Sequence, residues 1–310
     1  MSIDRGGALI MDMDSMQLFN IVLTGVIRGG LYALMAVGLS LVFGVMNIPN
    51  FAHGEFYMLG AYFSYFTYTY FHFGPISSIL LAAVGTFILG AIAEKTLFYP
   101  LRKRSKKNWI MNTFLLTLGI SIVLQNGAKM LWGNTYRGIT QYWPGKVSIA
   151  SFNISNDRIA GFCIAMVTIA IFWLFLNKTT MGRAIRAVSQ DETGASIVGV
   201  NLNVIHTLTF ALSCLLAGLA GAILLSISPA YPFMGVQPLY KSWFVLILVG
   251  MGNIGASIYG GLLVGLLETF AYMRFGSGWQ DVVSLVIIIM ILIFKPRGLF
   301  AKKGVKSVSE

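Results

Sequence analysis

Charged side chains are scarce in this chain of 310 residues, at 11%, whereas hydrophobic residues make up 56%. A water-soluble domain of this length could not solvate so apolar a surface, so the composition excludes a soluble protein and indicates a membrane protein. Cysteine is scarcer still: Cys163 and Cys214 are the two examples, and each lies inside an apolar run. Their positions favour small buried hydrophobic residues over a disulfide.

Motifs of enzyme chemistry are also missing. The three histidines, His53, His72 and His206, are scattered, and no His-Glu-x-x-His, paired-cysteine or nucleophilic serine motif occurs. The chain lacks the Gly-x4-Gly-Lys-Ser/Thr motif of P-loop ATPases, and the GxGxxG pattern at 250–255 interrupts apolar runs instead of opening a βαβ unit. We therefore expect no catalytic residue, no metal, no cofactor and no ATP site within this chain.

The balance of charge is strongly basic. Acidic residues number 11 against 22 lysines and arginines, which gives a formal net charge of +11. This charge does not indicate nucleic-acid binding, because the cations cluster in short loops beside apolar runs. The positive-inside rule assigns such loops to the cytoplasm. We expect cytoplasmic positions for the loops 101–107 and 178–203 and for the basic tail 295–310, and an external position for 133–156.

Nine apolar runs predict an all-α, polytopic transmembrane helix bundle of eight or nine spans, with 1–310 as one domain. The runs are 18–45, 52–73, 75–98, 109–132, 157–177, 203–228, 239–252, 255–275 and 281–295. A span needs about 20 residues, so 239–252 and 281–295 are marginal. The segment 1–16 lacks the features of a signal peptide, so the first span is expected to remain as an anchor. Nine crossings make the N-terminus external, and eight make it cytoplasmic.

A polar stretch separates the first two runs, where the chain otherwise reads as continuous membrane helix. It contains Asn47, Asn50, His53, Gly54 and Glu55. Polar groups and broken backbone are costly in hydrocarbon and persist only when buried in protein or lining a wet cavity. We predict that these residues line or gate a path at a helix junction, nearer the cytoplasmic side, and favour a hinge or gate over a binding pocket. Structural pairing is the alternative for His53 and Glu55.

The loop at 178–203 carries residues suited to two short helices: Gly182, Arg183, Arg186, Asp191 and Gly199. Gly182 and Arg183 are predicted to open the first helix. Asp191 is predicted to cap the second helix with its carboxylate, and Gly199 to end it. The pair forms either a rigid protrusion or an amphipathic linker on the membrane surface, and spacing alone does not decide between these.

Small residues recur at four-residue spacing in two of the runs, as Gly25 and Gly29 and as Gly261 and Gly265. In membranes such residues let helix backbones approach closely, so we predict packing between helices. Glu268 lies deep in the same run as the second pair and is expected to be protonated, paired or pore-facing.

Several motifs follow one another in a fixed order along nearly the whole chain. They are Phe43-Gly44-Val45, Asn50-Phe51-Ala52-His53-Gly54, Tyr57-Met58-Leu59-Gly60-Ala61-Tyr62, Gly182-Arg183-Ala184-Ile185-Arg186-Ala187-Val188-Ser189-Gln190-Asp191, Thr209-Phe210-Ala211-Leu212, Gly218-Leu219-Ala220-Gly221, Gly250-Met251-Gly252 and Lys295-Pro296-Arg297-Gly298-Leu299-Phe300. Together they resemble the permease subunits of branched-chain amino acid ABC transporters, the LivH-type family.

The resemblance implies a non-catalytic transport subunit of the bacterial inner membrane. Such permeases import amino acids together with a homologous second permease, a periplasmic substrate-binding protein and two cytoplasmic ATP-binding subunits, which hold ATP and Mg²⁺. The segment from Gly182 to Gly199 would be the coupling element that docks an ATPase, with Arg183, Arg186 and Asp191 serving the contact.

The chain departs from the family after Asp191, where the family often has Pro-Glu-Ala-Ala-Arg and this chain has Glu-Thr-Gly-Ala-Ser. Gly194 is expected to weaken the second short helix, and Ser196 removes a cation from the docking surface. Related permeases carry urea, other amides or other amino acids, so these substrates are alternatives. A self-sufficient channel or secondary transporter is the alternative from another class.

Overall fold

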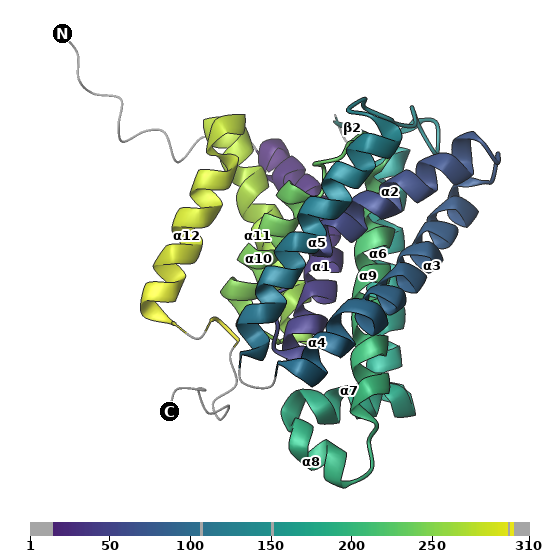
Figure 1. Ribbon diagram of the computed structural model, residues 1–310. Helices are drawn as coiled ribbons and strands as arrows, with labels where there is room; N and C mark the ends of the chain where they lie inside the picture. Colours follow the sequence, from purple (N-terminus) through teal and green to yellow (C-terminus); the bar gives the residue numbers. More distant parts are fainter. Residues whose placement is uncertain (1–14, 106–107, 150–151, 297, 301–310) are drawn as a thin grey trace.

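The computed structural model describes residues 15–105, 108–149, 152–296 and 298–300, and helices dominate it (Figure 1). The first half contains α1 (Ser15–Met46), α2 (His53–Thr69), α3 (Pro75–Ala93), the π-helical turn η1 (Glu94–Phe98), α4 (Tyr99–Arg104) and α5 (Trp109–Trp132). A hairpin of β1 (Lys146–Ile149) and β2 (Phe152–Ser155) leads to α6 (Asn156–Lys178), α7 (Thr180–Gln190), α8 (Glu192–Ile197) and α9 (Leu202–Leu224). The chain then forms α10 (Val236–Val249), α11 (Ile254–Phe275), the 3-10 turn η2 (Ser277–Trp279) and α12 (Gln280–Phe294).

Each of the nine apolar runs contains a helix, but the helices differ in length. Among the described residues, seven are long and apolar enough to cross a membrane: Leu18–Met46, Pro75–Arg104, Trp109–Trp132, Asn156–Lys178, Leu202–Leu224, Ile254–Phe275 and Ser277–Phe294. The marginal last run reaches this length because η2 extends it. The two remaining helices, α2 with 17 residues and α10 with 14, fall below the length of a straight crossing. The number of crossings, eight or nine, stays a prediction that depends on these two helices.

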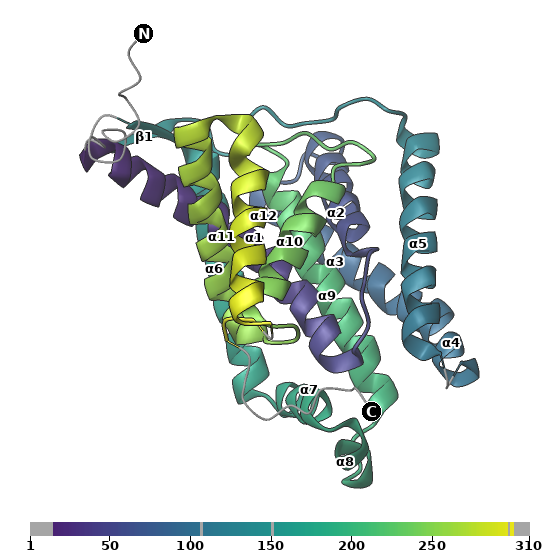
Figure 2. The ribbon, with the colours of Figure 1, turned by 90° about the vertical axis from the view of Figure 1, so that its left-hand side faces the viewer.

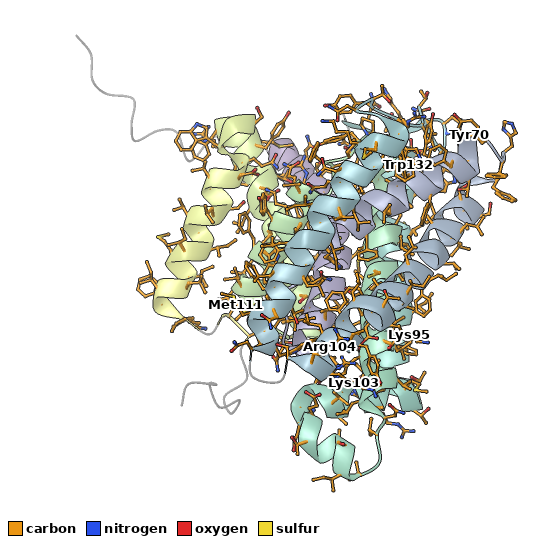
Figure 3. The ribbon with its side chains drawn as sticks, in the orientation of Figure 1. Tyr70, Lys95, Lys103, Arg104, Met111 and Trp132 are labelled. Carbon is orange, nitrogen blue, oxygen red and sulfur yellow. The ribbon has the colours of Figure 1, made fainter. Side chains whose placement is uncertain are left out.

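The third helix runs beyond its predicted end at residue 98. α3, η1 and α4 follow one another without a break as far as Arg104. The π-helical turn ends two residues before Pro100, which has no backbone N–H to donate and whose ring disturbs the α-helical ladder before it. Figure 3 shows Lys95, Lys103 and Arg104 at the end of the bundle that carries α7 and α8.

The glycine pairs predicted to pack between helices contact each other, and this prediction is confirmed. α1 runs antiparallel to α11 through the middle of the bundle (Figures 1 and 2). A Cβ on Gly29 would lie 2.7 Å from the Leu262 Cα, and one on Gly265 would lie 2.4 Å from the Gly29 Cα. Any larger residue at these positions would force the two backbones apart, so the crossing depends on the glycines.

The helices differ greatly in how far the protein covers them. In α1, 83% of the most apolar stretch is buried, whereas in α5 the share is 11%. Figure 2 shows α5 standing at one edge, separated from the other helices along much of its length. The few side chains through which α5 contacts the bundle therefore determine its position.

Residues 133–149 and 152–156 cover the end of the bundle opposite α7 and α8 (Figure 1). Asp157 accepts hydrogen bonds from the backbone amides of Tyr142 and Trp143, both at 3.0 Å. The backbones of Arg137 and Ala230 also exchange two hydrogen bonds, of 2.9 and 2.7 Å. This bridge fixes the start of the loop that leads back into the protein at α10.

Candidate functional site

The backbone between α1 and α2 is broken, as the polar stretch predicted. α1 ends at Met46, and Asn47 adopts a left-handed conformation with φ of 53° while its N–H donates to the Phe43 carbonyl at 3.0 Å. α2 begins at His53, whose ring contacts the Met35 carbonyl of α1. Met35 precedes the end of α1 by three helical turns, about 16 Å. The chain therefore runs back along α1, and α2 starts beside the middle of that helix.

This geometry corrects part of the predicted placement. Asn47 is exposed and directly follows α1, the C-terminal end of which lies toward α7 and α8 (Figure 2). The other four candidate residues, Asn50, His53, Gly54 and Glu55, are buried beside the middle of the bundle. Sequence reasoning placed all five near one end, because a helix break was taken as a surface junction. Here the broken segment instead reaches inward, and Asn47 does not join the other four.

His53 is a buried residue with both ring nitrogens engaged. Nε2 lies 3.1 Å from the Met35 carbonyl oxygen, and Nδ1 lies 3.2 Å from the Ser213 hydroxyl of α9. A carbonyl can only accept, so Nε2 carries a proton and donates to Met35, and in the neutral ring Nδ1 accepts from the Ser213 hydroxyl. The ring thus connects α1, α2 and α9. This is the structural pairing that sequence reasoning held as the alternative for His53.

Gly54 permits two interrupted helices to cross. A Cβ on Gly54 would lie 2.5 Å from the Gly235 carbonyl oxygen, and one on Gly235 would lie 1.9 Å from the Gly54 oxygen. Gly235 is the residue before α10, so the first turns of α2 and α10 meet at this glycine pair. Both helices begin inside the protein, and each is shorter than a full crossing.

Glu55 and Asn50 each keep one polar atom without a hydrogen bond. Glu55 is 1% exposed, and its Oε1 accepts from Ser121 Oγ and from Gln125 Nε2, both at 2.8 Å. Its Oε2 has no partner among the described residues. Asn50 Oδ1 accepts from the Ala52 amide at 3.1 Å, whereas Asn50 Nδ2 is buried and likewise finds no partner in the described part of the chain.

A polar face of α5 covers this segment, and sequence reasoning missed it. Its members lie four residues apart: Thr113, Thr117, Ser121 and Gln125. Thr117 Oγ1 lies 3.4 Å from the Pro49 carbonyl oxygen, while Ser121 and Gln125 hold Glu55. The four-residue spacing was the available signal, because residues at this interval share one side of a helix.

Aromatic rings complete the surroundings of the broken segment. Phe51 stacks on Trp243 of α10, with ring centroids 5.4 Å apart, and meets Phe114 of α5 edge to face at 5.3 Å. The Trp243 Nε1 is buried and has no hydrogen-bond acceptor among the described residues. We call residues 49–55, together with the contacting side chains of α5 and α10, the junction site.

The loop at 178–203 forms the two predicted helices, α7 and α8. α7 begins at Thr180, slightly before the predicted Gly182, and Thr179 Oγ1 caps it by accepting from the Gly182 amide at 3.0 Å. Gly182 is buried against α6, where a Cβ would lie 2.3 Å from the Phe175 carbonyl oxygen. Arg183 is exposed, and Arg186 Nη1 donates to Asn177 Oδ1 at 2.8 Å.

The predicted capping by Asp191 is wrong in its mechanism. Asp191 precedes α8, but its side chain makes no capping hydrogen bond. A Cβ on Gly194 would lie only 2.4 Å from Asp191 Oδ2, so the missing side chain of the glycine leaves room for this carboxylate. The helix α8 forms although it contains this glycine. Gly199 ends α8 as predicted: its φ is 89°, and the Val200 amide donates back to the Ala195 carbonyl at 3.0 Å.

A polar cluster connects α8 to the bundle. Glu192 of α8 lies 3.4 Å from Nε2 of His206 in α9, and Arg102 hydrogen-bonds the other nitrogen of that ring. Arg102 also pairs with Glu94 at 3.0 Å, and Thr207 donates to the second oxygen of Glu94 at 2.5 Å. The hydrogen bond with His206 lowers the pKa of Glu192, so this carboxylate stays ionised.

A second buried cluster lies between α10, α11 and α12. Lys241, which is 2% exposed, contacts the carboxylates of Glu268 and Asp281. Tyr32 donates to the remaining oxygen of Glu268 at 2.8 Å, and Gln280 donates to the same oxygen at 3.2 Å. Of the outcomes expected for Glu268, the structure has the paired one. Neither this cluster nor any other group of His, Cys, Asp and Glu in the described ranges has the arrangement of a metal site.

Known proteins match this chain along most of its length. Residues 21–292 match the family model described as "Branched-chain amino acid transport system / permease component". The chain is 29% identical over 301 residues to the high-affinity branched-chain amino acid transport system permease protein BraD of Pseudomonas aeruginosa, covering 93% of this chain and 97% of BraD. It is 28% identical over 306 residues to LivH of Escherichia coli, covering 94% and 97%.

A more distant relative extends the similarity to an archaeon. The chain is 26% identical over 288 residues to the probable branched-chain amino acid transport permease protein LivH of Methanocaldococcus jannaschii, covering 88% of this chain and 90% of the relative. No solved structure matches the chain.

Proposed function

This chain belongs to the family of permease components of branched-chain amino acid transport systems, and on that premise we propose that it is the membrane subunit of an ATP-driven importer of branched-chain amino acids. It is a multi-pass membrane protein. The observation that carries the proposal is the junction site, where two interrupted helices meet beside buried polar atoms that the protein leaves unpaired.

Interrupted helices support a transport role on physical grounds. Backbone without regular hydrogen bonds is tolerated at membrane depth only inside protein or along a wet cavity, and transporters place such breaks at their substrate routes. In this chain Asn50 and Glu55 would line the route. His53 and Gly54 would serve as the pivot, since they hold α2 against α1, α9 and α10. Asn47 would mark the exposed mouth at the end of α1.

Coupling to partner ATPases would run through α7 and α8. These helices project from the bundle at the end where Lys95, Lys103 and Arg104 lie, which supports a cytoplasmic position under the positive-inside rule (Figure 3). Gly182 presses α7 against α6, and Glu192 connects α8 to α9. A displacement of α7 and α8 would therefore be transmitted to the long helices α6 and α9.

The remaining parts of the importer would lie outside this chain. Two cytoplasmic ATP-binding subunits would hold ATP and Mg²⁺, a homologous permease would complete the route, and a periplasmic binding protein would deliver substrate to the opposite end. The whole chain, 1–310, would act as one permease domain of the bacterial inner membrane, crossing it eight or nine times. Transport of urea, other amides or other amino acids is the alternative within this class, and a self-sufficient channel is the alternative outside it.

One reconstitution tests the proposal. The complex is purified from its native membrane, its subunits are identified, and uptake of radiolabelled leucine, isoleucine and valine is measured in proteoliposomes with and without ATP. We expect uptake that requires ATP, the binding protein and the ATPase subunits. Equal uptake by this chain alone would favour the channel, and uptake confined to urea or another amide would overturn the branched-chain assignment.

The coupling role has its own test in Arg183, which is exposed on α7. We expect Arg183→Glu to lower the amount of ATPase that co-purifies with the permease, because the docking surface loses a cation and gains a like charge for an acidic partner. Lys146→Glu, which alters an exposed cation at the other end of the molecule, is the control. Normal ATPase recovery with Arg183→Glu would contradict the assignment.

A further inference from the structure

We propose that the junction site is a transient binding site for a zwitterionic α-amino acid, in which Glu55 receives the ammonium group while Asn50 and Trp243 donate to the carboxylate. The inference rests on the proposed transport function and adds to it a place and a chemistry of recognition. It follows from which polar atoms in the protein are left without partners, and of which kind they are.

The acceptor is one oxygen of Glu55. Ser121 and Gln125 both donate to Oε1, so this carboxyl group already accepts hydrogen bonds through one of its oxygens. Oε2 is buried and receives no hydrogen bond from the described residues, and no cationic side chain is paired with Glu55 among them. A buried carboxylate without a counter-ion is costly, and an ammonium group is the cation that an amino acid would supply.

The donors lie on the same segment and on the ring stacked upon it. Asn50 Nδ2 has no acceptor, although Asn50 Oδ1 is fixed by the Ala52 amide, so the amide orientation is set and the NH₂ group is the free end. Trp243 Nε1 can donate a hydrogen bond but cannot accept one, and here it has no acceptor among the described residues. The Trp243 ring stacks on Phe51 with ring centroids 5.4 Å apart. A carboxylate satisfies donors of both kinds, and charge makes these bonds stronger than neutral ones.

An apolar groove beside the site suits an aliphatic side chain. It has a volume of about 980 Å³ and lies between α2, α3, α4 and α5. Phe56, the neighbour of Glu55, lines it, as do Leu116 and Ile120, which flank Thr117 and Ser121 on α5. Asn50, Glu55 and Trp243 are not part of the lining of this groove, so one molecule would place its charged groups at the junction and its side chain in the groove only after α5 moves. Such an arrangement fits a branched-chain amino acid better than urea, which has neither an ammonium group nor a side chain.

Access to the site would require α5 to move. The described contacts of α5 with the junction are the two hydrogen bonds to Glu55, the Thr117 contact with Pro49 and the Phe114–Phe51 ring pair. Away from the junction, Trp132 at the end of α5 stacks on Tyr62 with ring centroids 4.2 Å apart, but only 11% of the most apolar stretch of α5 is buried. Displacement of this helix would expose Glu55 while leaving the His53 contacts of α2 intact.

The test measures ATP-driven leucine uptake by the full complex in proteoliposomes, normalised to the amount of assembled complex. We expect Glu55→Gln to lower the maximal uptake rate about ten- to a hundredfold without changing the concentration of loaded binding protein that gives half-maximal uptake. Glu55→Asp, which keeps the charge, should retain clearly more uptake than Glu55→Gln. Trp243→Phe keeps an aromatic ring beside Phe51 but removes the N–H together with part of the indole, so uptake per assembled complex should fall about three- to tenfold.

Glu268→Gln is the matched control, because Glu268 is an equally buried glutamate that is already paired with Lys241. It should reduce the amount of assembled complex more than the rate per complex. If the wild-type complex takes up no amino acid, the proposed function itself is overturned. If the wild type transports and both Glu55→Gln and Trp243→Phe transport equally well per complex, the binding site is overturned and the transport function stands.

Discussion

Two buried polar clusters in this protein differ in how completely they are paired. Around Lys241 the ammonium group meets Glu268 and Asp281, and the second oxygen of Glu268 accepts from Tyr32 and Gln280. At the junction site, by contrast, Glu55 has donors on one oxygen only, and Asn50 and Trp243 each leave a donor unused. Glu55, Glu268 and Lys241 are all buried, whereas Asp281 is exposed, so burial of the two glutamates alone does not explain the difference.

The comparison distinguishes buried polar groups that the protein pairs fully from buried polar groups that it pairs only in part. A buried charge is tolerated when partners inside the protein satisfy it, and the Lys241 cluster meets that condition while it holds the short helix α10 to α11 and α12. The junction site contains buried donors and a buried acceptor without partners among the described residues, and this lowers the stability of the protein unless a ligand or water forms hydrogen bonds with them. We therefore expect substitutions in the first cluster to affect folding, and substitutions in the second to affect transport.

The largest effect should come from removing Lys241. Lys241→Met leaves Glu268 buried without its cation, and loss of one partner from a buried pair costs about 3–5 kcal/mol. We expect a corresponding fall in the free energy of unfolding of the purified protein. Lys241→Met combined with Glu268→Gln should recover part of the loss, because the uncompensated charge is gone. A single variant as stable as the wild type would remove the contrast between the clusters.

A middle-sized effect is expected at the crossing of α2 and α10. In Gly54→Ala the new Cβ would meet the Gly235 carbonyl oxygen at 2.5 Å, a backbone atom that cannot move aside alone. Overpacking of this kind costs about 1–3 kcal/mol and should also displace Glu55 from Ser121. Gly127→Ala on α5 is the control, since nothing lies within 4 Å of its added Cβ and alanine favours a helix. If both variants unfold and transport alike, the glycine crossing is not a constraint.

The smallest effect is expected at Glu192, which lies outside the spanning helices and is about half exposed. Its pKa is lowered from 4.5 by the hydrogen bond with His206, so its contribution is complete above the unfolded pKa and is lost as pH falls through the lower folded pKa. An exposed pair of this kind contributes about 0–1 kcal/mol. We expect Glu192→Gln to flatten the pH dependence of unfolding below about pH 5 and to change little at pH 7. A pH profile identical to that of the wild type would exclude the contact in solution.

Residue patterns predicted much of this molecule. The nine apolar runs each contain a helix, Gly25 and Gly29 pack against Gly261 and Gly265, and Gly199 ends the second short helix. These features follow from composition and spacing within short stretches of the sequence. The same locality explains one error, because the position of the 47–55 segment depends on contacts of His53 with α1 and α9. Nothing in the structure explains why the Asp191 side chain does not cap α8.

The sequence by itself determined that this protein is a helical membrane bundle with a polar interruption after its first helix, because hydrophobic length and the cost of polar groups in hydrocarbon are properties of the chain alone. The tertiary structure decided which of those polar groups are satisfied. His53 finds both partners on α1 and α9, whereas Glu55 finds donors for one oxygen on α5. These partners lie between 18 and 160 positions away in the sequence, and only the folded arrangement of helices brings them together.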